Sequence, residues 1–242
     1  MLGNLHNWSN MARIFAVFEN PVAVLAAIIR RKAPENVVVR TPTGPVILAM
    51  RNFESLKTAF SVFCRGDYPV TGESSHFFVD IGSNVGVAAA FFLSRHRDNR
   101  AICCEPDEAN LAFLRRTLAQ FGDRVTILEK AIGPQAGIGE LHRSEDGKYS
   151  SLIDAGVTVA TQEVEIVAFS DILGRAVAMG ASDIVLKIDI EGLEPALVQS
   201  VDFADYPAIS RIIVESLECS ERIERSHARR VRSGYVEDLL FA

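Results

Sequence analysis

The chain has 242 residues and a formal net charge of −6, and 48% of its residues are hydrophobic and 23% charged. This composition is typical of an ordinary globular protein that is long enough to bury a sizeable core. The acidic balance offers no electrostatic footprint for DNA or RNA, so we expect no nucleic-acid partner.

The stretch Met11–Ile29 is the most apolar part of the N-terminal region, but Arg13, Glu19 and Pro21 interrupt it. Its clean run, Val22–Ile29, is far shorter than the roughly 20 residues that a transmembrane helix needs. We therefore expect helices of a core or a cap here, and no transmembrane segment. Contact with a membrane surface and a homodimer interface are the alternatives for this stretch.

The four cysteines are Cys64, Cys103, Cys104 and Cys219, and none of them forms a C-x-x-C pair. Cys103 and Cys104 lie within an apolar run. This usage is typical of reduced, buried thiols and not of a disulfide framework or a zinc site. We therefore expect a cytoplasmic protein.

Residues 1–73 predict a small N-terminal cap made of helices and a β-hairpin. The strand-like runs Asn36–Arg40 and Val46–Met50 lie on either side of Thr41–Pro45, which has turn chemistry. Phe53–Phe63 then carries apolar residues at helical spacing.

Residues 74–242 predict one larger domain in which strands and helices alternate. The expected strands are Phe77–Ile81, Ala101–Glu105, Val125–Glu129, Val164–Val167, Ile184–Asp189 and Arg211–Glu215. The expected helices are Val85–Arg95, Asp107–Phe121 and Phe169–Met179. This alternation predicts an α/β fold of the Rossmann-like type, with a mostly parallel central sheet and helices on both faces.

Two parts of this domain do not follow the alternation. Gly133–Thr161 is polar and glycine-rich, and we expect an insertion here, with a turn at Ser144–Lys148. At the C-terminus we expect an arginine-rich helix over Glu221–Arg232 and one final strand at Tyr235–Phe241.

The loop Gly82–Gly86 follows a predicted strand and precedes a predicted helix. A strand, a tight glycine loop and a helix N-terminus together form the local geometry that holds a nucleotide-like cofactor. Asn84 stands where the dinucleotide fingerprint has its second glycine, and Gly86 comes too early to be its third. The loop therefore fits S-adenosylmethionine better than NAD. We expect the methionine end of this cofactor to be held by Asp80, Gly82, Ser83, Asn84 and Gly86.

Five predicted strands end in an acid, at Asp80, Glu105, Glu129, Asp189 and Glu215. Because ligands of an open parallel sheet bind beyond the carboxyl ends of its strands, these acids are expected around one crevice. Glu105 stands where a carboxylate accepts the ribose hydroxyls of an adenosine cofactor, and Pro106 begins the next helix. Lys130 and Ala131 follow the third strand, at the expected position of the adenine.

The segment Lys187–Glu191 is the densest group of charges on a predicted strand. With a period of two residues, Lys187, Asp189 and Glu191 point to one side, and Ile188 and Ile190 point to the other. A lysine and an aspartate are costly to bury unless they are paired. We expect this group to line the reaction centre, with Asp189 as the first candidate for a general base, Glu191 as the second, and Lys187 as a further candidate. A purely structural Lys187–Asp189 ion pair is the alternative.

These blocks resemble the FkbM family of S-adenosylmethionine-dependent methyltransferases. The resemblance rests on Val79–Gly86, Glu105-Pro106, Ala131–Gly133, Ser150–Leu152, Leu186–Glu194, Glu215 and Gly234-Tyr235. It implies a class I methyltransferase fold and O-methylation of a hydroxyl on a sugar, glycan or polyketide-type acceptor. The family usually ends in an antiparallel hairpin, which we expect to be shortened here to one strand.

Other interpretations use the same residues. A Mg²⁺ ion held by the acids could lower the pKa of the acceptor hydroxyl, but we favour a site without a metal. An NAD-dependent oxidoreductase would share the first half of the fold, but it predicts a glycine in place of Asn84. The third alternative is a non-catalytic cofactor-binding module.

Overall fold

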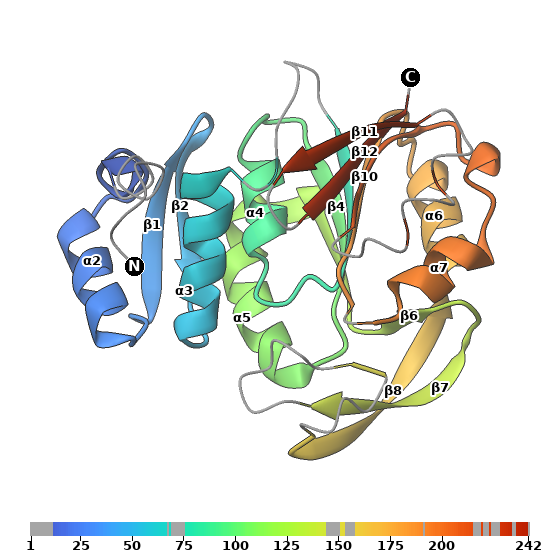
Figure 1. Ribbon diagram of the computed structural model, residues 1–242, viewed down its shortest axis with the longest axis horizontal. Helices are drawn as coiled ribbons and strands as arrows, with labels where there is room; N and C mark the ends of the chain where they lie inside the picture. The colour runs from blue at the N-terminus through green and yellow to red at the C-terminus, as the bar shows by residue number, and fades with distance from the viewer. Residues whose placement is uncertain are drawn as a thin grey trace.

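A seven-stranded sheet forms the centre of the molecule (Figure 1). The computed structural model describes residues 12–66, 68, 76–143, 151–152, 158–190, 192–214, 219, 223, 228–233 and 236–241. The strand order is β11-β12-β10-β9-β3-β4-β5. The five parallel strands are β3 (Phe77–Ile81), β4 (Arg100–Cys104), β5 (Val125–Leu128), β9 (Ile184–Ile188) and β10 (Ile209–Val214). The prediction of a mostly parallel Rossmann-like sheet is confirmed.

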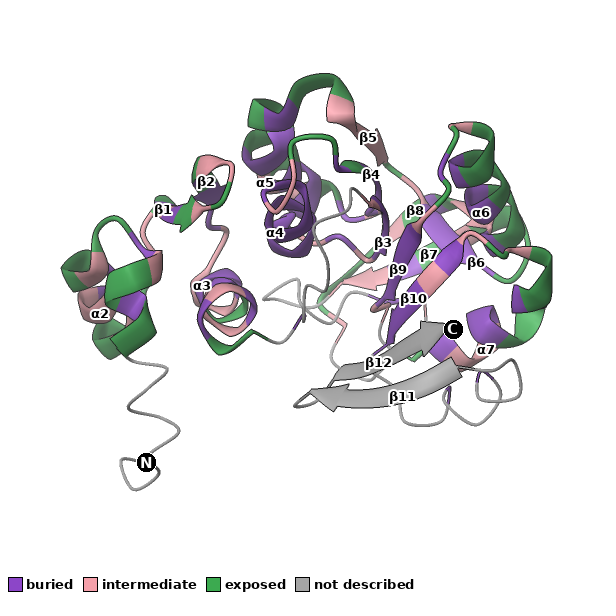
Figure 2. Cartoon of the chain, turned by 90° about the horizontal axis from the view of Figure 1, so that it is seen from above, coloured by how far each residue is buried: buried purple, intermediate pink, exposed green. Residues whose placement is uncertain are grey.

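Helices cover both faces of this sheet. On one face lie α4 (Val87–Leu93) and α5 (Glu108–Leu118), followed by a 3₁₀ segment at Ala119–Arg124, and on the other lie α6 (Phe169–Ala178) and α7 (Glu194–Ser200) (Figures 1 and 2). Alternate residues of one strand enter the two cores: Phe78 packs in the α4/α5 cluster, and Val79 packs in the α6/α7 cluster. A strand buried on both faces is therefore almost wholly apolar, as the sequence of β3 is.

The order in which strands are added to the sheet reverses between the parallel strands β3 and β9. From β3 the chain continues to β4 and β5 on one side, whereas β9 and β10 lie on the other side. Helix α7 was not predicted, because seven residues are too few to show helical periodicity. A crevice opens at such a switch point, beyond the carboxyl ends of the strands.

The N-terminal cap contains helical residues 12–17, α2 (Pro21–Arg30), the hairpin β1 (Asn36–Thr41) and β2 (Gly44–Ala49), and α3 (Phe53–Phe60), which continues as a π-helical turn to Arg65. Phe18, Leu48 and Leu56 of the cap lie in the same buried cluster as α4 and α5. The backbone N–H of Ala49 also donates to Thr117 Oγ1 of α5. The cap is thus packed directly against the helix layer, and a domain boundary at residue 73 stays a prediction.

The expected insertion contains strands that the sequence did not predict, whereas the strand expected at Val164–Val167 lies within one of them. A three-stranded sheet in the order β6-β8-β7 forms from β6 (Ala131–Gly133), β7 (Gly137–Arg143) and β8 (Ala160–Ala168). Exposed polar and charged residues on β7 and in the first half of β8 give these segments a loop-like composition. One face of an antiparallel pair can be solvated, and backbone pairing then determines the structure. The expected turn at residues 144–148 lies outside the described residues.

The C-terminal expectation also needs correction. Residues 228–233 form strand β11, not the end of an arginine-rich helix, and they pair antiparallel with β12 (Val236–Phe241). The terminal hairpin therefore has two strands and is not shortened to one. Charged residues are common on edge strands, so their sequence does not distinguish such a strand from a solvated helix.

All four cysteines are buried and free. Burial raises the pKa of Cys64 to about 12, with Arg13 opposing the shift, so the thiol stays protonated and unreactive at neutral pH. Within the described residues, no helix is both long enough and apolar enough to span a bilayer.

Candidate functional site

A pocket lies at the carboxyl ends of β3 and β9, where the strand order of the sheet reverses. It is bounded by the glycine loop after β3, the turn after β4, the start of β6 and the end of β9. Nine of the predicted site residues line it: Gly82, Ser83, Asn84, Glu105, Pro106, Lys130, Ala131, Lys187 and Asp189. These residues are far apart in sequence, and the parallel sheet brings them to one crevice.

Lys187 occupies the floor of this region. Its Nζ lies 3.1 Å from Asp80 Oδ1 and 3.3 Å from Asp189 Oδ2, and it donates to Gly82 O at 3.1 Å. Asp80 and Lys187 are register partners on the adjacent strands β3 and β9. The three donors of one ammonium therefore join two strand ends and the glycine loop.

The charge states of this group follow from burial and pairing. Burial lowers the pKa of Lys187, but Asp189 and Asp80 outweigh this effect and raise it well above its ordinary value. Burial also raises the pKa of Asp80, with Lys187 opposing the shift. Lys187 is therefore an ammonium at neutral pH. It can orient carboxylates and the loop, but it cannot accept a proton from an acceptor in that state.

Two glycines allow the loop to approach its neighbours closely. Gly82 has φ +81°, and a Cβ placed there would lie 1.9 Å from Asp189 O. Gly86 has φ +85° and caps α4, and its Cβ would lie 2.8 Å from Leu114 Cδ1. A Cβ at Gly82 would therefore meet the backbone of β9, whereas at Gly86 it would meet a leucine side chain and the positive φ is the stronger reason for glycine.

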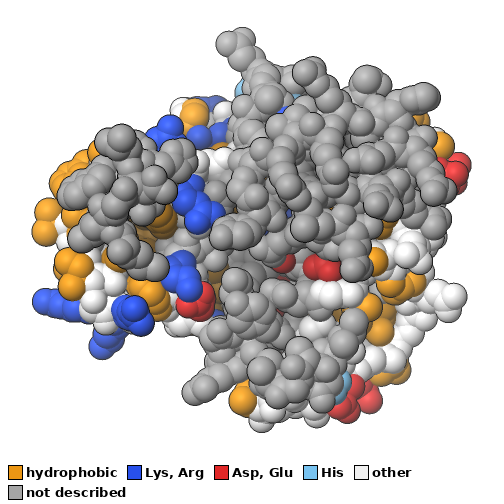
Figure 3. All heavy atoms as spheres, viewed as in Figure 1, with side chains coloured by type: hydrophobic (Ala, Val, Ile, Leu, Met, Phe, Trp, Pro, Cys, Tyr) orange, Lys and Arg blue, Asp and Glu red, His pale blue; other side chains and the backbone are white. Residues whose placement is uncertain are grey.

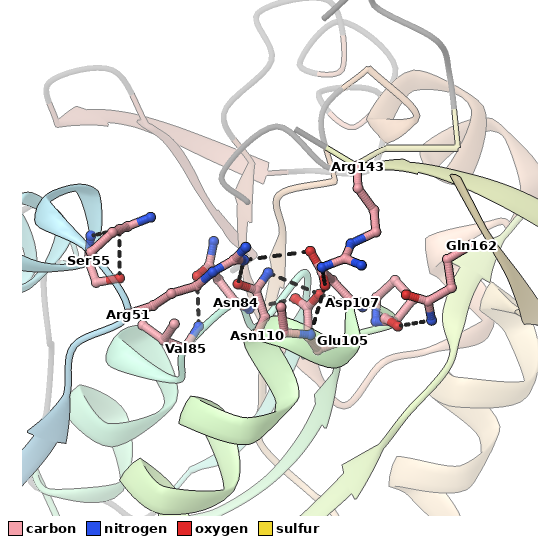
Figure 4. Close-up of polar contacts among 12 residues, drawn as sticks. Arg51, Ser55, Asn84, Val85, Glu105, Asp107, Asn110, Arg143 and Gln162 are labelled. Atoms are coloured by element: carbon pink, nitrogen blue, oxygen red, sulfur yellow. Dashed lines mark hydrogen bonds and ion pairs between the residues drawn. The ribbon is translucent and has the colours of Figure 1, made fainter. Parts of the chain in front are cut away.

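Glu105 lies 5% exposed at the end of β4 and faces the same pocket. Its Oε2 accepts the backbone N–H of Asn84 at 2.8 Å, and its Oε1 accepts the N–H of Asp107 at 2.9 Å and Asn110 Nδ2 at 3.3 Å (Figure 4). Burial raises the pKa of Glu105 to about 7, although the hydrogen bonds from Asp107 and Asn84 oppose the shift. Because these three hydrogen bonds use three of its roughly four lone-pair positions, the carboxylate retains one, on Oε2, for an O–H donor.

An outer layer of polar contacts surrounds Glu105 (Figure 4). The buried Asp107 lies 3.6 Å from Nη1 of Arg51 and 3.2 Å from Nη2 of Arg143. Arg51 Nη1 also donates to Asn110 Oδ1 at 2.5 Å. Arg51 follows β2 of the cap and Arg143 ends β7, so two peripheral sheets hold the residues that hold Glu105.

The turn after β9 has its own support. Glu194, at the start of α7, accepts the backbone N–H of Ile190 at 3.1 Å and of Gly192 at 2.8 Å. These bonds fix the turn that presents Asp189 to the pocket. Glu191 lies outside the described residues, so its predicted role stays a prediction.

Some predicted site residues lie elsewhere. Asp80 and Gly86 support the loop from behind and do not line the pocket, and Glu129 pairs with Arg115 on the surface. Glu215 lies outside the described residues.

Sequence reasoning did not find Thr58 and Tyr68, which reach the pocket from the cap, or the support from Arg51, Asn110 and Arg143. No local spacing connects these residues to the crevice. Ser151 and Leu152 complete the wall near Ala131.

The described residues include no group of three or more His, Cys, Asp or Glu side chains arranged to hold a metal ion. The acids of the pocket are instead engaged with Lys187 or with backbone N–H groups. A role for Mg²⁺ stays an untested alternative, since Glu191 and Glu215 are outside the described part.

The parallel sheet, the glycine loop and the crevice at the switch point define a Rossmann-like α/β protein of the kind that holds a nucleotide-like cofactor. Residues 80–235 match the family described as Methyltransferase FkbM domain. The chain belongs to this methyltransferase family. None of the curated proteins matches the sequence.

Several solved structures are similar to the chain. A precorrin-6y C5,15-methyltransferase from Geobacter metallireducens is 13% identical, with 69% of this chain and 78% of that chain covered and a TM-score of 0.37. A methyltransferase from Geobacter sulfurreducens is 16% identical, with 76% of each chain covered and a TM-score of 0.38. A tRNA (uracil-54, C5)-methyltransferase from Pyrococcus abyssi, in complex with S-adenosyl-L-homocysteine, is 12% identical, with 86% and 44% covered and a TM-score of 0.41. Similarity at this level carries no information on substrates.

Replacing Lys187 by Met should lower the free energy of unfolding by about 3–5 kcal/mol, because it leaves the Asp80 carboxylate buried without its countercharge. The loss should shrink as the pH falls, because Asp80 can then take up a proton. Urea unfolding at several pH values measures both effects. The double variant Asp80→Asn/Lys187→Met is the matched control and should lose less than the single variant. A pH-independent loss below about 1 kcal/mol would contradict the role of Lys187 as the countercharge of Asp80.

Replacing Arg51 by Ala should cost about 1–3 kcal/mol of unfolding free energy, because Asn110 and the buried Asp107 lose a charged hydrogen-bond partner. Arg116→Ala is the matched control, since Arg116 joins α5 to Glu35 of the cap through an exposed pair at 2.6 Å. That pair should contribute less than about 1 kcal/mol. Equal losses in the two variants, measured by urea unfolding, would show that Arg51 acts only as another surface contact.

Proposed function

We propose that the protein is an S-adenosylmethionine-dependent methyltransferase that acts on a hydroxyl group of a small-molecule or glycan acceptor. The observation that carries the proposal is the buried carboxylate of Glu105, which faces the pocket beside the glycine loop. Its Oε2 accepts the Asn84 N–H at 2.8 Å, so one carboxylate connects the loop to the expected ribose position. Membership of the FkbM methyltransferase family supports the same reading.

The pocket fits the parts of this cofactor. Glu105 Oε2, which already accepts one hydrogen bond, can accept a second from a ribose hydroxyl. Pro106, Ala131, Ile132 and Leu152 supply an apolar wall of the kind that an adenine ring requires. The loop from Gly82 to Asn84 lies toward Lys187 and Asp189, where the methionine end would extend.

Asp189 is the side chain best placed to act as the base. When bound, the cofactor supplies a sulfonium whose methyl group is already activated for transfer. The chain must then bind the acceptor in line with that methyl group, and orientation of this kind is worth on the order of 7–11 kcal/mol. The acceptor hydroxyl loses its proton as the new bond forms, and the partly exposed Asp189 carboxylate can accept it. Lys187, at 3.3 Å, fixes the position of this carboxylate.

The acceptor end of the pocket is formed in part by the cap. Thr58 and Tyr68 line the pocket together with Asp189 and Lys187. A hydroxyl, an aromatic ring and a carboxylate suit a hydroxylated acceptor, because they combine hydrogen bonding with an apolar surface. A sugar, glycan or polyketide-type acceptor is the class that the family resemblance implies.

S-adenosylhomocysteine should bind the wild-type protein in calorimetric titrations, and NADH should not. Because the ribose hydroxyls need an ionised acceptor, affinity should fall roughly three- to tenfold as the pH is lowered from 8 to 6, through the Glu105 pKa of about 7. Glu105→Gln should bind more weakly and lose this pH dependence. Tight NADH binding with indifference to S-adenosylhomocysteine would support the oxidoreductase alternative instead.

Asp189→Asn should leave S-adenosylhomocysteine affinity near the wild-type value while methyl transfer falls by roughly 10²-fold or more. Transfer is measured with a methyl-labelled donor and a panel of hydroxylated sugars and polyketide-like alcohols. Unchanged turnover would exclude Asp189 as the base. Activity that survives exhaustive EDTA treatment would remove the Mg²⁺ alternative, and binding without any transfer would favour a non-catalytic module.

A further inference from the structure

Large apolar side chains are exposed on the first helical part of the cap. Phe15 is 56% exposed, Val22 68% and Ile29 81%. Val22 and Ile29 are seven positions apart on α2 and so lie on one side of the helix. The opposite side of α2 is packed in the core through Val24 and Ala27. Figure 3 shows hydrophobic side chains gathered at the end of the molecule where α2 lies in Figure 1.

Three basic side chains stand next to these apolar residues. Arg30, Arg31 and Lys32 end α2, and all three are exposed. None of them pairs with an acid in the described part of the chain. Arg31 has φ +50° in the left-handed conformation at the helix C-cap, where glycine is usually favoured. The end of α2 therefore carries a compact positive charge beside an apolar surface.

The cap also differs from the larger domain in its charge, which is positive in the cap and negative in the domain. Residues 1–73 contain eight Lys and Arg against five Asp and Glu, whereas residues 74–242 contain seventeen against twenty-six. A negatively charged surface would attract the cap and repel the larger domain. The molecule would thus be oriented with α2 toward that surface.

We propose that the surface formed by Val22, Ile29 and the cluster Arg30–Lys32, with the exposed Phe15 of the preceding helical segment, docks on an anionic lipid surface. Apolar side chains would enter the boundary between headgroups and acyl chains, and the basic side chains would contact phosphate groups. The helix would lie on the bilayer and not cross it, since α2 has only ten residues. A second copy of the chain is a poorer partner, because the described residues that flank α2 offer Glu19 and Glu35, the latter already paired with Arg116, against three basic side chains. This proposal does not depend on the methyltransferase assignment.

Co-sedimentation of the full chain with vesicles tests the proposal. Vesicles of phosphatidylcholine with about 30% phosphatidylglycerol should bind the protein, and vesicles of phosphatidylcholine alone should bind it far less. Binding should weaken as salt is raised, because screening removes the attraction. Absence of binding to the anionic vesicles, or equal binding to both compositions, would overturn the proposal.

Matched variants separate this surface from general stickiness. Lys32→Glu should weaken binding to the anionic vesicles by on the order of fivefold or more, whereas the exposed Arg97→Glu should not. Ile29→Asp should also weaken it, whereas Ile138→Asp, at a site that is 73% exposed on β7, should not. Loss of binding in the control variants would contradict the assignment. A lipid-free dimer of the wild type that Ile29→Asp converts to a monomer would assign this surface to a second copy.

Discussion

The buried ammonium of Lys187 is the contact on which the arrangement of the site depends. Its three acceptors, on Asp80, Asp189 and Gly82, belong to two adjacent strand ends and to the loop between β3 and α4. Charges at this depth persist only when they are paired, so the three segments must come together for the pairing to exist. The close approach of Gly82 to Asp189 O follows from the same requirement, since any Cβ would separate the loop from β9.

Around this centre, support comes from progressively more distant parts of the chain. Glu105 is held by backbone N–H groups of the loop and of the following turn, and Asp107 is then held by Arg51 and Arg143. Arg51 belongs to the cap, and Arg143 to the sheet that contains β8. Hydrogen bonds to Glu105 favour its charged form while burial disfavours it, which places its pKa near neutrality.

The sequence predicts the centre of the site better than its periphery. β3, the glycine loop, Glu105 and the Lys187/Asp189 pair were identified because each has a local signature: an apolar run, a glycine spacing, or a charge within a buried strand. Arg51 could not be identified in this way, since it lies 59 positions from Asn110 and has no motif. Strand β11 was mistaken for a helix because only its pairing with β12 distinguishes them.

In the proposed enzyme, the centre of the site would bind the cofactor, and its periphery would bind the acceptor. The wall assigned to the cofactor consists of segments 82–85, 104–106 and 130–132, which the parallel sheet brings together by its own topology. The proposed acceptor end includes Thr58 and Tyr68 of the cap, which lie outside the residues that match the methyltransferase family. Changes at Thr58 or Tyr68 can therefore reshape this wall, whereas Arg51 of the same cap supports Glu105 through Asp107 and Asn110. Under the proposed function, Thr58 and Tyr68 would contribute to the choice of acceptor, and the carboxyl ends of the parallel strands would bind the methyl donor.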